Sequence, residues 1–160
     1  MKGATLSPEL AQQKIKSWCA YQERSQHETR QKLYDYGLFS EDVESIIANL
    51  IGENFLNDER FAIAFAGGKF RIKYWGKGKI KNELKKHQVS EYCINKALKA
   101  IDPEEYEKMI LKVMEKKIKL TKVPASQKRY YSILNYLVSR GFESDLVRAQ
   151  LNVLNEGLNE

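Results

Sequence analysis

The sequence has 160 residues, so it forms one ordinary domain or a few small modules. Hydrophobic residues make up 42% of it and charged residues 30%, with only three prolines, a composition that favours a helix-rich protein with a core over a disordered chain. The formal net charge of +6 makes polyanions or acidic protein surfaces the expected partners.

The first third of the chain predicts three helices. A serine cap followed by proline and glutamate begins the first helix at Ser7, and Ser25 with Glu28 forms a capping box for the second. The second helix is expected to end at Gly37, a residue suited to the left-handed conformation after a helix. Ser40 is expected to cap the third helix, whose apolar residues recur at helical spacing.

The middle of the chain begins with a helix that has an apolar side and a cationic side. Asn57 or Asp58 is expected to accept hydrogen bonds from the free amides of its first turn. Asp58 and Arg60 are expected to tie this helix to its neighbour rather than to contact a ligand. The apolar side is predicted to include residues at helical spacing, namely Phe61, Phe65, Gly68 and Ile72.

The later helices follow similar signals. Gly76 and Gly78 predict a turn between two helices, and Ser90 is expected to cap the helix after the next turn. Asp102, followed by proline, predicts the start of another helix. Pro124 interrupts the helical pattern after it, because the residue before a proline avoids the helical conformation.

The chain also contains an internal repeat. Leu33, Leu84 and Leu137 occupy equivalent positions, at offsets of 51 and 53 residues, and four further apolar columns keep the same register. The break between two helices recurs at one position, which is glycine in the first and third units and Gln88 in the second. Each unit is therefore predicted to be helix, helix, short turn, helix.

These units predict an all-α protein of three tandem three-helix repeats, at residues 7–55, 56–101 and 102–155. Strand signals are almost absent, with no long β-branched alternation and no Asn-Gly or Asp-Gly hairpin pair. Because a unit of this size buries little surface by itself, adjacent repeats are expected to stack into an elongated, curved array.

No constellation of residues predicts catalysis, a cofactor or a metal site. His27 lies in the capping box and is expected to face solvent, and His87 is expected to act as a dipole partner at a helix end. Together with Cys19 and Cys93 they show no metal-ligand spacing, and the cysteines are expected to be small core residues. No phosphate-binding loop motif occurs. We therefore expect a protein that is not an enzyme.

The sequence also predicts a cellular location. Residues 1–10 are too polar for a signal peptide, and no apolar run approaches the roughly 18 residues of a membrane span. Two distant cysteines make no disulfide framework, which fits a reducing compartment. The expected location is the cytoplasm, with no membrane contact.

Two basic segments are the candidates for function. Residues 69–86 and 108–129 each contain eight Lys or Arg against one acid. A solvated surface usually explains lysines, but both segments lack the acids of a salt-bridged surface and lie in neighbouring repeats. Tyr74 and Trp75 either stack on bases or fill the gap between helices. The candidate binding residues are Lys69, Arg71, Lys73, Lys77, Lys79, Lys81, Lys85, Lys112, Lys116 and Lys119.

A central motif gives the chain a family resemblance. It comprises FLNDERFA at residues 55–62, KFR at 69–71 and WGKGKI at 75–80. The first unit agrees through AYQERS at residues 20–25, and the third through RGF at 140–142. These segments resemble the RecX family of bacterial regulatory proteins, over about residues 10–154. The chain departs from some members by having glutamine at position 88, where glycine is usual.

The resemblance implies tandem three-helix repeats and a regulatory function. Members of the family bind the RecA recombinase and its filament on single-stranded DNA, usually inhibiting ATP hydrolysis and strand exchange. We expect a monomer that binds this filament, with the single-stranded DNA backbone as a second contact. The alternatives are a general nucleic-acid-binding helical module without a recombinase partner and a purely structural helical scaffold. The family's central motif is shared largely for packing, so the binding residues rest on charge alone.

Overall fold

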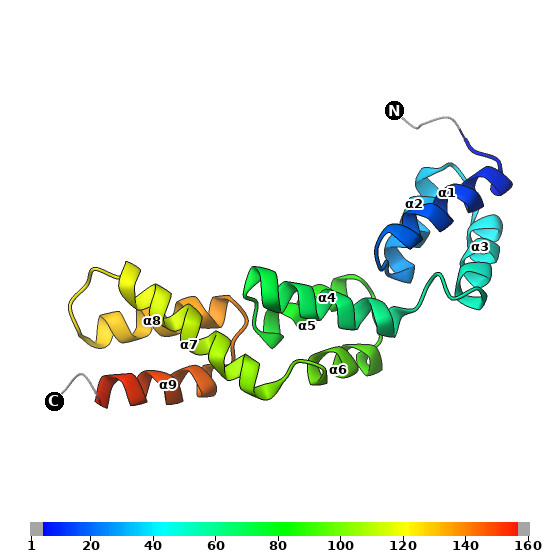
Figure 1. Ribbon diagram of the computed structural model, residues 1–160. Coiled ribbons are helices and arrows are strands. Elements are labelled where there is room, and N and C mark those ends of the chain that lie inside the picture. The colour runs from blue at the N-terminus through cyan, green and yellow to red at the C-terminus, as the bar shows by residue number, and fades with distance from the viewer. Residues whose placement is uncertain (1–4, 157–160) are drawn as a thin grey trace. The chain divides into compact units, whose positions relative to one another are not determined.

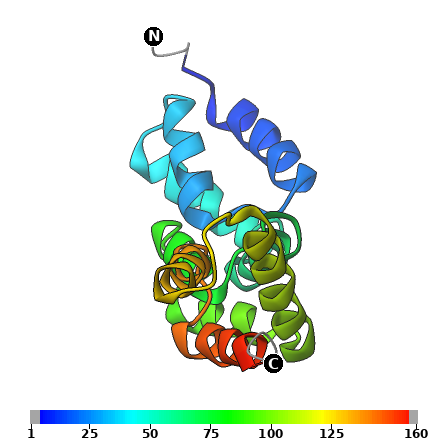
Figure 2. The same cartoon turned by 90° about the vertical axis from the view of Figure 1, so that its left-hand side faces the viewer.

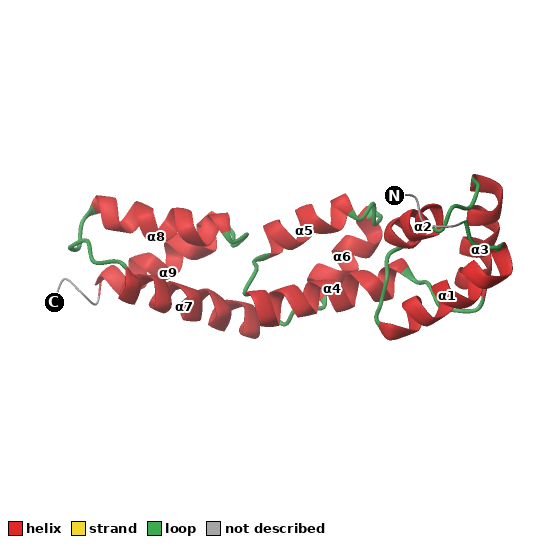
Figure 3. Cartoon of the chain, turned by 90° about the horizontal axis from the view of Figure 1, so that it is seen from above, coloured by secondary structure: helices red, strands yellow, loops and turns green. Residues whose placement is uncertain are grey.

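The computed structural model describes residues 5–156, and the all-α prediction is confirmed there. Figure 1 follows the chain from end to end, and Figure 3 shows helices and loops with no strand in the described part. Residues 1–4, part of the segment judged too polar for a signal peptide, lie outside it. The helices are α1 (Pro8–Tyr21), α2 (Gln26–Asp35), α3 (Ser40–Gly52), α4 (Asp58–Lys73), α5 (Lys77–Lys86), α6 (Glu91–Lys99), α7 (Pro103–Leu120), α8 (Gln127–Ser139) and α9 (Ser144–Glu156).

The helices pack into two compact units. Unit 1 comprises Met1–Phe65 and Leu84–Ala97, and unit 2 comprises Ala66–Glu83 and Leu98–Glu160, so the division falls inside α4, α5 and α6. In unit 1, α1, α2 and α3 pack on one another (Figure 1). In unit 2, α8 packs on both α7 and α9 (Figure 2). The repeat boundaries and the curved array expected from the sequence stay predictions.

Capping residues set most of the helix starts. The hydroxyl of Ser7 accepts a hydrogen bond from a first-turn amide of α1 at 3.3 Å. The Ser25 hydroxyl accepts from the Glu28 N–H at 3.0 Å and the Glu28 carboxylate accepts from the Ser25 N–H at 2.8 Å, so the capping box is confirmed. The Ser40 prediction is wrong, because Ser40 lies inside α3 and the cap position is Phe39, whose side chain makes no cap bond.

The repeat is visible in the backbone and in the core. Gly37, Gln88 and Gly141 have φ values of 87°, 56° and 100°, and each donates its N–H at 2.9 Å to the carbonyl three residues earlier. Gln88 thus adopts the left-handed conformation that a glycine adopts in the other two units. The first apolar column is fully buried at Leu33, Leu84 and Leu137.

The buried face of α4 differs from the predicted one at its C-terminal end. Phe61 and Phe70 are 4% and 3% exposed, and Ala62 and Ala66 between them are fully buried. Ile72 was predicted on the same face, but it is 75% exposed, so that part of the prediction is wrong. Ile72 lies about 200° around the helix from Phe70 but only about 20° from Phe61, so the buried side of α4 changes along its length.

Candidate binding surface

Net positive charge is confined to unit 2. This unit carries 17 Lys and Arg against 10 Asp and Glu, whereas unit 1 carries 10 against 11. The formal net charges are therefore +7 and −1. Nine of the ten candidate binding residues belong to unit 2, and Lys85 belongs to unit 1. A surface that attracts a polyanion through charge is therefore expected in unit 2.

The candidate residues differ in exposure. Their side chains come from α4, α5 and α7. The exposed members are Arg71, Lys73, Lys85, Lys112, Lys116 and Lys119. The half-buried members are Lys69, Lys77, Lys79 and Lys81. The exposed set can contact a partner without any movement of the helices, whereas the half-buried set already contributes to packing.

Trp75 holds two of the half-buried lysines. The ammonium nitrogens of Lys79 and Lys69 lie 4.6 Å and 5.0 Å from the centroid of its ring. The backbone N–H of Trp75 donates to the Lys69 carbonyl at 3.2 Å, which holds the Trp75 backbone beside the end of α4. Cation–π contacts of this kind contribute about 0.5–1 kcal/mol each at exposed sites. The lysines therefore compete with nucleobases for this ring, and the packing role of Trp75 is favoured over base stacking.

Tyr74 brings the two basic segments together. The Lys112 ammonium on α7 lies 4.7 Å from the centroid of the Tyr74 ring and 3.4 Å from its hydroxyl oxygen. Tyr74 has a φ of 57°, a left-handed conformation that reverses the chain between α4 and α5. Residues from 69–86 and 108–129 thus meet within unit 2, although their role in binding stays a prediction.

Two glycine turns pack against each other within unit 2. The Gly76 N–H donates to the Arg140 carbonyl at 2.8 Å, and the Gly78 N–H donates to the Gly141 carbonyl at 2.9 Å. A Cβ on Gly76 would lie 2.2 Å from the Gly141 carbonyl carbon, so a larger residue requires the backbone to move. The Arg140 guanidinium also donates to the Lys73 carbonyl at the end of α4. The predicted helix–helix turn is thus confirmed at Gly76 alone, because the turn comprises residues 74–76 and Gly78 lies inside α5, which begins at Lys77.

Tyr106 on α7 is buried, and its hydroxyl makes hydrogen bonds beside both of these turns. Its hydroxyl accepts from the Lys77 N–H at 3.1 Å and donates to the Glu143 carboxylate at 2.8 Å. Its ring packs between Phe70 and Phe142, with centroids 5.8 Å and 5.6 Å away. Burial raises the pKa of the Tyr106 hydroxyl well above its usual range, and the bond to Glu143 acts in the same direction. Lys77 therefore has a structural role besides any role in binding.

Asp58 and Arg60 have the structural role predicted for them. Asn57 caps α4, because its side-chain oxygen accepts from the Arg60 N–H at 2.9 Å. Asp58 instead accepts at 2.9 Å from the Gln26 N–H, the first amide of α2. The Arg60 guanidinium donates to Glu23 at 2.5 Å. Burial raises the pKa of the Asp58 carboxyl, and the bond from Gln26 opposes that shift.

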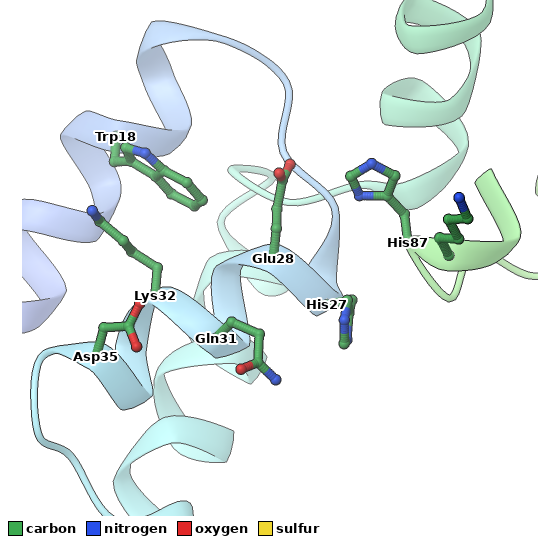
Figure 4. Close-up of a pocket in the computed structure, with 8 residues that line it drawn as sticks. Trp18, His27, Glu28, Gln31, Lys32, Asp35 and His87 are labelled. Atoms are coloured by element: carbon green, nitrogen blue, oxygen red, sulfur yellow. The ribbon is translucent and has the colours of Figure 1, made fainter. Parts of the chain in front are cut away.

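A pocket of about 300 Å³ lies in unit 1 and is shown in Figure 4. His87 packs on Phe61 and Phe65, with centroids 5.2 Å and 5.3 Å away, and its Nδ1 lies 3.5 Å from the Ser25 hydroxyl. His87 is thus a packing residue, and its expected role as a dipole partner at the end of α5 stays a prediction. The pocket is lined by Trp18, His27, Glu28, Gln31, Lys32, Asp35, Lys86 and His87. The polar groups of Ser25 and Glu28 are already used by the cap of α2.

Metal and thiol chemistry find no support in the described residues. Within residues 5–156, no group of three or more His, Cys, Asp or Glu side chains is placed to hold a metal. Cys19 is buried, as predicted, and burial raises its pKa, which keeps its thiol protonated; Cys93 is half-buried. In the same part of the chain, no helix is both long and apolar enough to cross a membrane.

A second pocket, of about 280 Å³, lies in unit 2 between α4 and α7. It is lined by Phe70, Arg71, Glu105, Lys108, Met109 and Lys112. Arg71 and Lys112 are binding residues predicted from the sequence, whereas Lys108 and Met109 were not predicted. The available signal was the spacing of Lys108, Lys112 and Lys116, which follow one another at intervals of four residues along α7.

Comparisons with known proteins agree with this architecture. Models of the second and third three-helix domains of RecX match residues 57–98 and 104–151. A regulatory protein RecX of Thermotoga maritima is 30% identical over 141 residues, which cover 86% of this chain and 80% of that protein. One of Clostridium perfringens is 32% identical over 124 residues. That match covers 76% of this chain but only 58% of the relative, so the chain spans little more than half of it.

Solved structures show the same fold. The crystal structure of RecX from Lactobacillus salivarius superposes with a TM-score of 0.83 over 92% of this chain and 96% of that one, at 19% identity. A second crystal structure, of a regulatory protein RecX, gives a TM-score of 0.77 over 92% of this chain and 79% of that one, at 23% identity. At these identities the likeness establishes the fold and nothing further.

Proposed function

This chain belongs to the RecX family, and from that membership we propose that it is a regulatory protein of the RecA recombinase. It binds the filament that RecA forms on single-stranded DNA, and it inhibits ATP hydrolysis and strand exchange. The basic surface of unit 2 provides the contact. We define this surface by the nine candidate residues of unit 2, Lys69, Arg71, Lys73, Lys77, Lys79, Lys81, Lys112, Lys116 and Lys119.

The observation that supports unit 2 as the contact surface is its concentration of charge. Unit 2 has a formal net charge of +7 and unit 1 of −1, so the cations are not spread evenly for solubility. A filament on single-stranded DNA presents phosphates along its whole length, and lysines that neutralise them release bound counterions. The exposed residues Lys116 and Lys119 lie in the last turns of α7, where nothing described covers them.

The mechanism follows from binding rather than from chemistry. A helical protein that lies along a filament contacts more than one protomer and the DNA backbone together. Such contact stabilises one arrangement of neighbouring protomers and opposes the movements that accompany hydrolysis. It also occupies space that a second DNA duplex needs for strand exchange. Inhibition therefore requires no catalytic residue in this chain.

The direct test is RecA ATPase activity on single-stranded DNA, titrated with this protein. We expect the wild type to inhibit hydrolysis. The double variant Lys116→Glu with Lys119→Glu should raise the protein concentration at half-maximal inhibition about tenfold, because two phosphate contacts become repulsive. The matched control is Lys14→Glu with Lys96→Glu, two exposed lysines of unit 1 that change the net charge equally. No inhibition by the wild type would refute the RecA proposal. Equal shifts in both pairs would refute the role of unit 2.

The second candidate is a nucleic-acid-binding module without a recombinase partner, which the +7 charge of unit 2 also favours. It predicts tight binding to bare single-stranded DNA, with an affinity that falls steeply as salt is raised. It also predicts no effect on RecA hydrolysis when DNA is in excess, because free DNA then takes up the protein. Persistent inhibition in excess DNA would favour the RecA partner.

A further inference from the structure

The pocket between α4 and α7 combines an apolar floor with a cationic rim. Its least exposed lining residues are Phe70, at 3%, and the half-buried Met109. The exposed lining residues are Arg71, Lys108, Lys112 and Glu105. Three cations against one carboxylate leave the rim with a formal charge of +2. A ligand that matches this pocket therefore carries both an apolar group and negative charge.

The local sequence explains how the pocket forms. On α7, Glu105, Lys108, Met109 and Lys112 have the i, i+3, i+4, i+7 spacing of one helix face, which puts the methionine among the charged residues. On α4, the Arg71 guanidinium folds back over a glycine. A Cβ on Gly67 would lie 2.6 Å from the Arg71 Nη2 atom, so the missing side chain leaves room for the guanidinium.

The size of the pocket limits what it can take. At about 280 Å³ it lies just below the range of about 300–1,000 Å³ that holds small-molecule ligands and cofactors. One or two side chains of a peptide fit this volume. A methionine at the floor adapts its shape to different aliphatic or aromatic groups, since its chain is unbranched and its sulfur polarisable.

The aromatic groups at this place favour a peptide over a nucleic acid. Bases bind single-strand sites by stacking on open aromatic faces. Phe70 is almost fully buried, and the neighbouring Tyr74 already carries the Lys112 ammonium over its ring, 4.7 Å from the centroid. The floor thus offers depth for a side chain but no open platform for a base.

We propose that this pocket binds an acidic segment of a partner protein, in which one apolar side chain is flanked by carboxylates. The apolar side chain enters between Phe70 and Met109, and the carboxylates meet Arg71, Lys108 and Lys112. The inference deepens the proposed function and rests on it for the claim that the basic surface meets a protein. Peptide binding itself is measurable without any recombinase.

The test uses the full chain and two fluorescein-labelled peptides, each with two short glutamate runs. One has a leucine between the runs and the other has a serine. We expect the leucine peptide to bind about fivefold more tightly by fluorescence anisotropy, because only leucine gains from the apolar floor. Equal affinities would overturn the proposal, since they would mean that surface charge alone attracts the peptides.

Substitutions at the pocket sharpen the result. Met109→Ser should remove most of the fivefold preference for leucine, and Met109→Leu should keep it. Lys108→Glu should weaken the binding of both peptides about tenfold. Lys128→Glu makes an equal charge change at an exposed position of α8, and it should leave the preference for the leucine peptide intact. A leucine preference that survives Met109→Ser would overturn the assignment of the pocket. If Met109→Ser does not fold, Met109→Leu and the wild-type peptide contrast decide alone.

A labelled oligo-deoxythymidine distinguishes the nucleic-acid outcome. We expect its binding to be unchanged by Met109→Ser, because phosphates meet lysines over the whole basic surface. Loss of oligonucleotide binding together with an absent leucine preference would make this a nucleic-acid site and overturn the proposal. Inhibition of RecA without peptide binding would defeat this inference but not the proposed function, and the reverse result would defeat only the proposed function.

Discussion

Cations lie over aromatic rings in both units, and in unit 1 arginines also pair with carboxylates. Arg30 and Arg60 reach Glu44 and Glu23 at 2.6 Å and 2.5 Å. In unit 2, the Lys79 ammonium lies 4.6 Å from the centroid of a tryptophan ring. The ion pairs of unit 1 follow from its composition, because it has 11 acids for 10 cations, whereas unit 2 has 10 acids for 17 cations.

This difference suggests how unit 2 keeps its charge available. An ion pair neutralises a cation towards an approaching polyanion, but a ring leaves its full charge while holding the side chain in place. Lysines held in this way lose less conformational entropy when they bind a phosphate or a carboxylate. Substitutions in unit 2 are expected to change the free energy of unfolding through its turn contacts and the Tyr106 hydroxyl, and substitutions in unit 1 through a helix cap.

The largest effect is expected from Gly76→Ala in unit 2. Its Cβ would lie 2.2 Å from backbone at Gly141, so the two turns must separate, at a cost of about 3 kcal/mol of unfolding free energy. The matched control is Gly68→Ala inside α4, where nothing lies within 4 Å and a gain of about 0.5–1 kcal/mol is expected. Urea denaturation measures both. Equal stability of the two variants would contradict the turn contact.

The next effect is expected from Tyr106→Phe, which leaves the Glu143 carboxylate and the Lys77 N–H without the hydroxyl. We expect a loss of about 2 kcal/mol at neutral pH. Tyr131→Phe changes an exposed ring and should alter stability by less than about 0.5 kcal/mol.

The contribution of Tyr106 should also depend on pH. Its pKa is raised in the folded protein, so its stabilisation is complete below the unfolded value of about 10 and is lost as the pH rises above it. The stability difference between the wild type and Tyr106→Phe should therefore shrink between pH 8 and about pH 11. A difference that grows with pH would mean that the hydroxyl is ionised in the folded state.

A smaller effect is expected from Asp58 in unit 1, which caps α2 from the neighbouring helix. Asp58→Ala removes the acceptor for the Gln26 N–H, and we expect a loss of about 1.5 kcal/mol. Asp58→Asn keeps an acceptor but removes the charge at the positive end of α2, for a loss of about 0.5 kcal/mol. Thermal unfolding followed by circular dichroism measures both. Equal losses would assign the effect to charge alone.

The smallest effect is expected at Gln88, and it is stabilising. Glutamine there holds a φ of 56°, which glycine adopts without strain. Gln88→Gly should therefore raise the unfolding free energy by about 0.5 kcal/mol, after the greater freedom of glycine in the unfolded chain is subtracted. Gln88→Asn should lie between the two, because asparagine tolerates this conformation. Destabilisation by glycine would show that the glutamine side chain contributes to packing.

Much of the fold could be predicted because its signals are local. The capping box of Ser25 and Glu28 needs only four residues of sequence, and the left-handed break at Gly37 follows from one. The prediction for Ile72 failed because the helical period alone did not show which side of α4 would be buried. The candidate surface could be placed in the chain by charge, but not resolved into exposed and packed lysines, since Trp75 and Tyr106 decide which are held.

By itself, the sequence determined the helices, the repeat of 51 and 53 residues and the basic segments, because capping, periodicity and composition act over short stretches. Only the tertiary structure decided that Asp58 caps α2, that the Gly76 turn meets Gly141 and that Met109 lies in a cationic pocket. These contacts join residues up to 65 positions apart (141 minus 76), where chain geometry and packing, rather than local preference, select the partner.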